Sequence, residues 1–306
     1  MGKVDLMINL LITDAGGPAA IGVLKSLKNR KDVKVIACDA NPLSCGLYLA
    51  DKNYTIPTMY DSDFVDVMFS ILKREKIDVV FPTGGNDLLW WSDNKDTFED
   101  MGVTLMMSDY DSIKKCVDKL LFYETCKDNC LLPKTYSKFQ GYTMFMKPVH
   151  GKGSVGARLI TPYNQIPTDQ PYLFQDNLSG DEWTIDALCD MDGNPLSVVP
   201  RKRLEVKAGI STKGVIQLNK HIITECENMC RFLNLKGPIC LQMKEDENGN
   251  PKFIEINPRF GGSTIFATHA GVNFPSILLD IYLGKDISID TAKEYTILRY
   301  YEEMVI

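Results

Sequence analysis

The sequence predicts an α/β protein in which a small doubly wound domain precedes a mixed α+β region. Strand and helix signals alternate with short connections in the first third of the chain, and short strands dominate from Leu131 onward. Such alternation is typical of a parallel sheet with helices on both faces. The chain has 306 residues, 44% of them hydrophobic and 24% charged. These values are ordinary for a globular protein of about two domains.

The first part of the chain has the signals of a Rossmann-like domain. The apolar run over 6–13 ends at a glycine turn, as expected for a strand buried on both faces. Apolar residues over 18–28 recur at helical spacing, with Pro18 near the start of the helix. The other expected elements are strands over 33–39, 78–82 and 103–107 and a helix over 64–74. We expect this domain to cover residues 1–108.

The remainder of the chain opens with an expected helix over 109–128, for which Asp111 or Ser112 is an available cap. A second helix is expected over 214–233, where apolar residues recur at helical spacing. Short strands are expected at 143–147, 158–161, 172–175, 182–189, 196–200, 239–245 and 252–257, and a last helix at 274–283.

Composition excludes several classes of protein. The net charge of -6 disfavours nucleic acid as a partner and electrostatic recruitment to a membrane. No apolar stretch approaches the length of a membrane span, and the N-terminus lacks the pattern of a signal peptide. Nine scattered cysteines, three histidines and no C-x-x-C indicate reduced thiols rather than disulfides or zinc. We therefore expect a cytoplasmic protein.

The glycine turn near the N-terminus suggests a dinucleotide site, but its spacing is wrong. Gly16 and Gly17 are adjacent and Pro18 follows them, which departs from G-x-G-x-x-G. Gly17 and Gly22 have the spacing of a Walker A motif, yet Val23 stands where that motif has lysine. An NAD-dependent oxidoreductase therefore remains a minor alternative.

A carboxylate–amide cluster near the C-terminus is the sharpest signal. Side chains alternate along a strand, so Glu255 and Asn257 point to the same face. If residues 248–249 form a two-residue turn, Gln242 lies directly opposite Glu255. Oxygen ligands of this kind suit Mg²⁺, and Arg259 just beyond the strand suits a phosphoryl oxygen. The alternative is an ordinary polar face on a hairpin.

A glycine-rich segment in the middle of the chain has the features of a phosphate-binding loop. Lys147 ends a strand as a fixed cation, and Gly151, Gly153 and Gly156 leave backbone N–H groups free for phosphate oxygens. Ser154 adds a hydroxyl donor. By itself such a loop is more often only mobile, and its pairing with the oxygen cluster is what favours a phosphate lid.

Together these segments resemble the ATP-grasp superfamily, and within it one synthetase unit of the carbamoyl-phosphate synthase large subunit. The motifs in chain order are Asp118-Lys119, the loop 147–156, Gln175 with Glu182, Gln242, and the run 255–259. The resemblance implies a pre-ATP-grasp domain at 1–108, a lid subdomain with its linking helix at 109–172, and a C-terminal subdomain with the Mg-ATP site at 173–306.

The resemblance also implies roles for single residues. Lys119 and Lys147 would contact the phosphates of ATP, Glu182 the ribose and Gln175 the adenine. Arg259 would steady the transferred phosphate. The implied ligands of Mg²⁺, or of Mn²⁺ in its place, are Gln242, Glu255 and Asn257. Arg203 or Lys207 would help at an acyl phosphate, although a solvated charge run is an equal alternative.

The activity that the resemblance implies is phosphorylation of a small carboxylate, with release of ADP, followed by attack of an amine. A chain of 306 residues cannot hold the second synthetase unit of the relative, so a freestanding ligase is favoured. Alternatives are a subunit of a split carbamoyl-phosphate synthase and a non-catalytic nucleotide-binding regulator. A homodimer is compatible with each of them.

Overall fold

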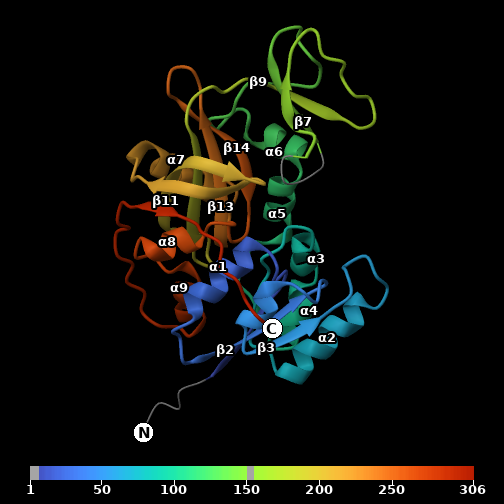
Figure 1. Ribbon diagram of the computed structural model, residues 1–306, viewed down its shortest axis with the longest axis vertical. Helices are drawn as coiled ribbons and strands as arrows, with labels where there is room; N and C mark the ends of the chain where they lie inside the picture. The colour runs from blue at the N-terminus through green and yellow to red at the C-terminus, as the bar shows by residue number, and fades with distance from the viewer. Residues whose placement is uncertain (1–6, 150–154) are drawn as a thin grey trace.

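Three β-sheets follow one another along the longest axis of the protein (Figure 1). The computed structural model describes residues 7–149 and 155–306. A five-stranded parallel sheet lies at one end, a six-stranded antiparallel sheet in the middle and a four-stranded antiparallel sheet at the other end. The α/β class and the order of a parallel part before a mixed part are therefore confirmed.

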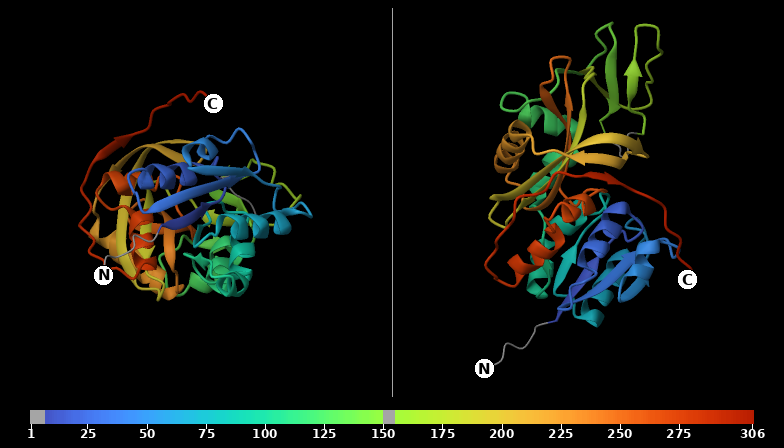
Figure 2. Two further views of the ribbon diagram at one scale, coloured as in Figure 1. Left: turned by 90° about the horizontal axis from the view of Figure 1, so that it is seen from below. Right: turned by 60° about the vertical axis from the view of Figure 1, so that its left-hand side comes forward.

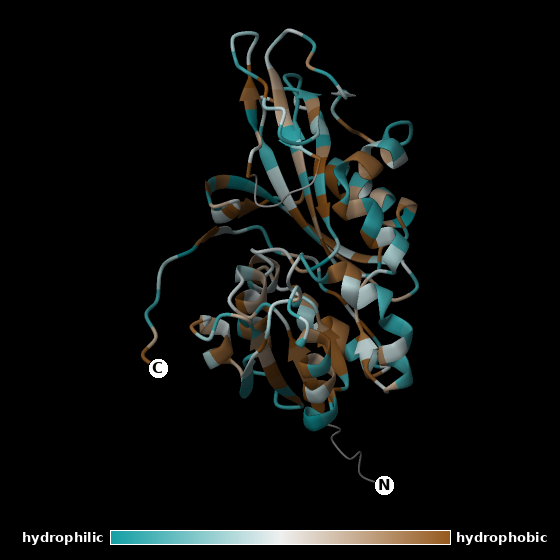
Figure 3. Cartoon of the chain, turned by 90° about the vertical axis from the view of Figure 1, so that its right-hand side faces the viewer, coloured by the Kyte–Doolittle hydropathy of each residue, from teal (hydrophilic) through white to brown (hydrophobic). Residues whose placement is uncertain are grey.

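The N-terminal sheet has the strand order β3-β2-β1-β4-β5, with all neighbours parallel. Its central strands are buried on both faces, and hydrophobic residues dominate them (Figure 3). The strands are β1 Ile8–Ile12, β2 Val33–Asp39, β3 Lys52–Thr55, β4 Val79–Phe81 and β5 Thr104–Leu105. The helices are α1 Pro18–Leu27, η1 Cys45–Leu49, α2 Phe64–Glu75, α3 Leu88–Asp93 and α4 Lys95–Asp100. Sequence periodicity located β2 and α1 well, whereas the mostly exposed edge strand β3 lacked an apolar pattern.

The helix predicted over 109–128 is wrong, because the chain forms two helices there. These are α5 Tyr110–Val117 and α6 Lys119–Cys126. Asp118 between them is extended, and its carboxylate accepts hydrogen bonds from the N–H groups of Leu120 and Leu121, both at 3.0 Å. An aspartate that caps the second helix competes with continuation of the first. The cap predicted at Asp111 or Ser112 is also wrong, since α5 begins after Asp109 without a side-chain cap.

The four-stranded sheet is a small unit with a core of its own. Its order is β6-β9-β7-β8, from β6 Thr135–Tyr136, β7 Met144–Pro148, β8 Arg158–Ile160 and β9 Tyr172–Asp176. Its buried core consists of Met144, Met146, Ile160 and Phe174. The domain boundaries at 108 and 172 stay predictions. Because β9 belongs to this sheet, we propose that the lid subdomain ends after Asp176.

The six-stranded sheet has the order β14-β13-β10-β11-β12-β15. Its strands are β10 Glu182–Cys189, β11 Pro195–Lys207, β12 Ile210–Ile216, β13 Gly237–Glu245, β14 Pro251–Asn257 and β15 Thr296–Leu298. The helices that follow these strands are α7 Lys220–Phe232, α8 Ile265–His269 and α9 Phe274–Tyr282. The helix predicted over 214–233 starts too early. Gly214 pairs with Arg203 in a strand, and Asn219 caps α7 by accepting from the N–H of His221 at 3.0 Å.

The two faces of the six-stranded sheet differ in chemistry. One face packs the apolar side chains of Trp183, Ile185 and Ala187 against α7. Alternation along β10 puts Glu182, Thr184 and Asp186 on the opposite face. The opposite face is therefore the polar face, where a site can form.

The parallel domain and the C-terminal subdomain share one hydrophobic core. Ile8 and Val23 of the parallel domain belong to the same buried cluster as Phe260, Phe266 and Leu278. Helix α1 packs against α8 and α9, as Figure 1 and Figure 2 both show. The glycine turn that precedes α1 is thus held close to the polar face. Within the described ranges no helix is both long and apolar enough to cross a membrane.

Candidate active site

A row of polar side chains crosses four neighbouring strands on the polar face of the six-stranded sheet. Gln242 of β13 lies opposite Glu255 of β14 on one side and Thr184 of β10 on the other. Thr184 lies opposite Arg201 of β11. The predicted pairing of Gln242 with Glu255 is confirmed.

The connection between β13 and β14 nevertheless differs from the predicted turn. Glu245 pairs with Pro251, so the connection is the five-residue loop 246–250 rather than the two-residue turn 248–249. A bulge follows, because Met243 pairs with Phe253 and Ile254 has no partner in the ladder. The extra residue restores the register that a two-residue turn would have given. It also frees the carbonyl of Ile254, which accepts a hydrogen bond from Nζ of Lys147 at 3.1 Å.

The predicted metal ligands share the polar face. Asn257 pairs with Cys240, two residues along each strand from the Gln242–Glu255 pair. All three predicted ligands, Gln242, Glu255 and Asn257, are half-buried. In the described parts of the chain, no group of three or more His, Cys, Asp or Glu is placed to hold a metal ion. A cation here would thus take one carboxylate and two amide oxygens, and substrate phosphates would complete its shell. That donor set fits Mg²⁺.

Two lysines lie in the electrostatic field of Glu255. Burial lowers the pKa of Lys147 to about 8, with Glu255 opposing the shift and the charge of Lys119 adding to it. Burial also lowers the pKa of Lys119, and the charge of Glu255 again opposes this shift. The Asp118 cap fixes Lys119 at the first position of α6. Residues from the lid sheet, the linking helix and the central sheet therefore meet around one carboxylate.

Only part of the predicted phosphate loop is described. Gly151, Gly153 and Ser154 lie outside the described residues. Gly156 has a φ of +76°, which favours glycine, and a Cβ there would lie 3.0 Å from Cγ of Pro148. The far end of the loop therefore folds back on the residue that follows Lys147.

The predicted ribose and adenine residues have protein partners. Glu182 accepts from Nη1 of Arg203 at 2.6 Å, and Nη2 of Arg203 donates to the carbonyl of Gly209 at 2.7 Å. Arg203 thereby connects Glu182 to the turn between β11 and β12. Gln175 is buried in the lid sheet, where its amide donates to Oγ1 of Thr135 at 2.8 Å. That hydrogen bond fixes the orientation of the Gln175 amide.

Arg259 is partly buried, whereas Lys207 is exposed. Arg259 donates from Nη1 to the carbonyl of Phe260 at 2.7 Å, and its Nε is buried without a partner among the described residues. Lys207 is exposed near the tip of the β11–β12 hairpin, with its ammonium 3.7 Å from the carboxylate of Glu205. No hydrogen bond or ion pair in the described ranges joins Lys207 to the rest of the site.

Sequence reasoning missed two further features of the polar face. Arg201 and Asp186 form a fully buried ion pair, each with about 1% of its surface exposed. Arg299, directly after β15, donates from Nη2 to the carbonyl of Gly262 at 2.5 Å. The guanidinium groups of Arg201 and Arg299 lie over the ring of Phe266, at 5.6 and 5.3 Å from its centroid. Alternation along β11 separates Arg201 and Arg203 from Lys202, but no local pattern marks Arg299.

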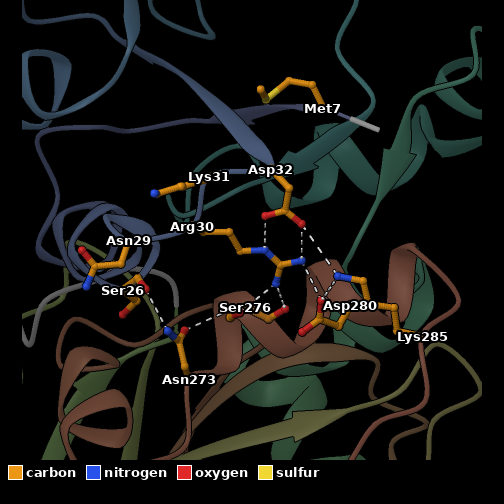
Figure 4. Close-up of a pocket in the computed structure, with 10 residues that line it drawn as sticks. All are labelled: Met7, Ser26, Asn29, Arg30, Lys31, Asp32, Asn273, Ser276, Asp280 and Lys285. Carbon is orange, nitrogen blue, oxygen red and sulfur yellow. Dashed lines mark hydrogen bonds and ion pairs between the residues drawn. The ribbon is translucent and has the colours of Figure 1, made fainter. Parts of the chain in front are cut away.

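A depression in the described structure lies away from this face. It has a volume of about 700 Å³ and lies between the end of α1 and α9 (Figure 4). Arg30 at its centre pairs with Asp32 at 2.8 Å and Asp280 at 2.6 Å and donates to the carbonyl of Ser276 at 2.7 Å. Because its charges satisfy one another, this is a joint between the parallel domain and the C-terminal subdomain rather than a ligand site.

A parallel domain, a small lid sheet and a large sheet with an oxygen cluster make up an ATP-grasp fold, and two family models match separate parts of the chain. Residues 168–304 match the family model described as ATP-grasp in the biosynthetic pathway with Ter operon. Residues 10–106 match the model described as PylC-like, N-terminal domain. The superfamily indicated by the sequence motifs is confirmed.

Solved structures share the fold at low sequence identity. The chain superposes on Rhizobium etli pyruvate carboxylase with a TM-score of 0.73 at 15% identity, covering 92% of this chain and 29% of the carboxylase. N5-carboxyaminoimidazole synthetase from Staphylococcus aureus complexed with ADP gives 0.71 at 16% identity, covering 96% and 81%. L-amino acid ligase from Bacillus licheniformis gives 0.68 at 17% identity, covering 89% and 73%. No curated protein has a significantly matching sequence.

Proposed function

We propose that this chain is an ATP-dependent carboxylate–amine ligase. A carboxylate is phosphorylated with release of ADP, and an amine attacks the acyl phosphate to form an amide or peptide-like bond. The observation that carries the proposal is the meeting of Lys119 and Lys147 around the carboxylate of Glu255, which pairs with Gln242 across the sheet. Cations and oxygen ligands at one point are what transfer of a phosphoryl group requires.

In this proposal the chain holds and orients the nucleotide. Lys119 and Lys147 contact its phosphates, Glu182 its ribose and Gln175 its adenine. The N–H groups of Gly151, Gly153 and Gly156 and the hydroxyl of Ser154 are donors to the phosphate oxygens. A Mg²⁺ ion held by Gln242, Glu255 and Asn257 would supply charge neutralisation for the moving phosphoryl group.

Basic residues assist the transferred group. Arg259 lies just beyond β14, and its buried Nε has no hydrogen-bond partner among the described residues, as expected for a guanidinium that takes a phosphoryl oxygen on binding. Arg203 leaves Glu182 when the ribose hydroxyls take that carboxylate, and it then turns toward the acyl phosphate together with Lys207. These assignments rest on the hydrogen bonds of Arg203 to both Glu182 and the Gly209 turn.

The names of two structural neighbours support the ligase proposal. An L-amino acid ligase and an N5-carboxyaminoimidazole synthetase have this fold over most of the chain. Their identities of 17% and 16% leave the substrates of this chain open. We therefore propose the class of reaction and a small acid and a small amine as substrates.

The test is to incubate the protein with Mg-ATP and a matrix of amino acids and small carboxylates, and to measure nucleotide products and new masses together. We expect ADP, phosphate and one condensed mass for a specific acid–amine pair. Formation of AMP and pyrophosphate would contradict an acyl phosphate. Nucleotide binding without turnover would favour a subunit of a split carbamoyl-phosphate synthase or a regulator.

A further inference from the structure

Positive charge on the polar face is not confined to the residue that is assigned to the transferred phosphate. Arg259 is already assigned to the phosphate, and Arg201 is neutralised by Asp186. Arg203 is paired with Glu182. Arg299 is a fourth guanidinium in this region, and among the described residues no carboxylate forms an ion pair with it. Its hydrogen bond to the Gly262 carbonyl uses one of its five donors.

The surroundings of Arg299 favour an anion. Burial and the positive charge of Arg201 lower the pKa of Arg299, and Asp186 opposes this shift only in part. Arg201 is itself 1% exposed, and its Nε and Nη2 are buried without partners in the described ranges. Two cations lie over the Phe266 ring, and Asp186 forms an ion pair with only one of them, Arg201. A negatively charged ligand would offset the remaining charge.

The N-terminus of α1 reaches the same place from the other side. A Cβ on Gly262 would lie 3.3 Å from Cγ of Pro18, the first residue of α1. The helix has ten residues, no acidic residue in its first turn and no side-chain cap on its N-terminus. The Asp39 carboxylate accepts from the N–H of Gly16 just before the helix at 2.7 Å, whereas the N–H groups of the first turn itself have no side-chain partner in the described part of the chain. Gly262 lies between this helix end and Arg299.

We infer that Arg299 and the first turn of α1 form a second oxyanion subsite. This subsite binds a carboxylate of one substrate that is not itself activated by ATP. The planar guanidinium favours a carboxylate, which it can bind through two parallel hydrogen bonds. The ligand class is therefore a dicarboxylic acid, or an amino acid that enters as the amine and keeps its own carboxylate. This inference rests on the proposed ligase function.

The test compares pairs of small molecules that differ by one anionic group. Succinate is compared with butyrate, L-alanine with L-alaninamide, and phosphoserine with serine, by calorimetry in the presence of Mg-ADP. The variants are Arg299→Gln and Arg299→Lys. Arg231→Gln on the exposed face of α7 is the matched control, since its guanidinium is 3.8 Å from Glu227 and half-exposed.

We expect the wild type to prefer at least one carboxylate-bearing partner, with a preference on the order of tenfold to a hundredfold. Arg299→Gln should abolish that preference, Arg299→Lys should retain part of it, and Arg231→Gln should leave it unchanged. No preference in any pair, or a preference that persists in Arg299→Gln, would overturn the inference. A preference only for phosphoserine would overturn its assignment to a carboxylate.

The two proposals can fail separately. Carboxylate binding that depends on Arg299, without ATP turnover in any mixture, would refute the ligase and leave the subsite. ATP-dependent joining of a monocarboxylate to an amine without an acidic group, unaffected in Arg299→Gln, would refute the subsite and leave the ligase.

Discussion

Replacement of Lys147 by methionine should weaken nucleotide binding and stabilise the free protein. The pKa of Lys147 falls from 10.5 to about 8 because the ammonium is buried. At about 1.4 kcal/mol for each pH unit, holding this charge in the free protein costs about 3 kcal/mol. Loss of the hydrogen bond to the Ile254 carbonyl offsets about 1 kcal/mol of the gain. We expect Lys147→Met to raise the free energy of unfolding by about 2 kcal/mol at pH 7.

The pH dependence follows from the direction of the shift. The folded pKa lies below the unfolded one, so the destabilisation is fully present below about pH 8. It disappears as the pH rises from there toward the pKa of a free lysine. The stability difference between wild type and Lys147→Met should therefore shrink above pH 8. The affinity of the wild type for Mg-ADP should fall as the pH rises above 8, because phosphates bind the charged form of Lys147.

The assay is urea unfolding at pH 7 and pH 9, together with calorimetric titration of Mg-ADP. Lys147→Met should bind Mg-ADP about 10- to 150-fold more weakly at pH 7, as expected for loss of a charge-assisted contact. Lys73→Met on the exposed surface of α2 is the matched control. A variant that binds Mg-ADP as tightly as the wild type would refute the assignment of Lys147 to the phosphates. A loss of stability would refute the burial argument.

Three further predictions test separate parts of the site. Asp118→Ala should lower the free energy of unfolding by about 1 kcal/mol through loss of the α6 cap. It should also weaken Mg-ADP binding, because the cap positions Lys119. Unchanged binding would contradict this positioning role. Glu255→Gln should reduce turnover at least about a hundredfold with an unchanged melting temperature. Glu247→Gln on the neighbouring loop should leave turnover unchanged. Full activity of Glu255→Gln would exclude the assignment of Glu255 as a metal ligand. Arg30→Met should lower the free energy of unfolding by about 1 to 2 kcal/mol, because it removes the hydrogen bonds to Ser276 and two half-buried ion pairs, while Lys285 still pairs with Asp32 and Asp280. Mg-ADP affinity should be unchanged, and a folded variant that no longer binds Mg-ADP would contradict a purely structural role for this joint.

The sequence by itself determined much of this protein. Apolar periodicity located β2 and α1, and the alternation of side chains put Glu255 and Asn257 on one face. These features are local, since each depends on the spacing of residues within one element. The motifs together identified the superfamily and the nucleotide-binding residues to test.

Other features were decided only by tertiary structure. The break at Asp118 depends on which of two competing backbone hydrogen-bond arrangements packs better, and the strand at Gly214 depends on its partner in β11. The five-residue loop and the bulge at Ile254 compensate for each other, so neither is visible from the residue pattern. Arg299 reaches the site only because β15 pairs with β12 and α1 packs against the α8 segment. Such contacts join residues far apart in the chain, and their geometry follows from how the sheets and helices pack rather than from local spacing.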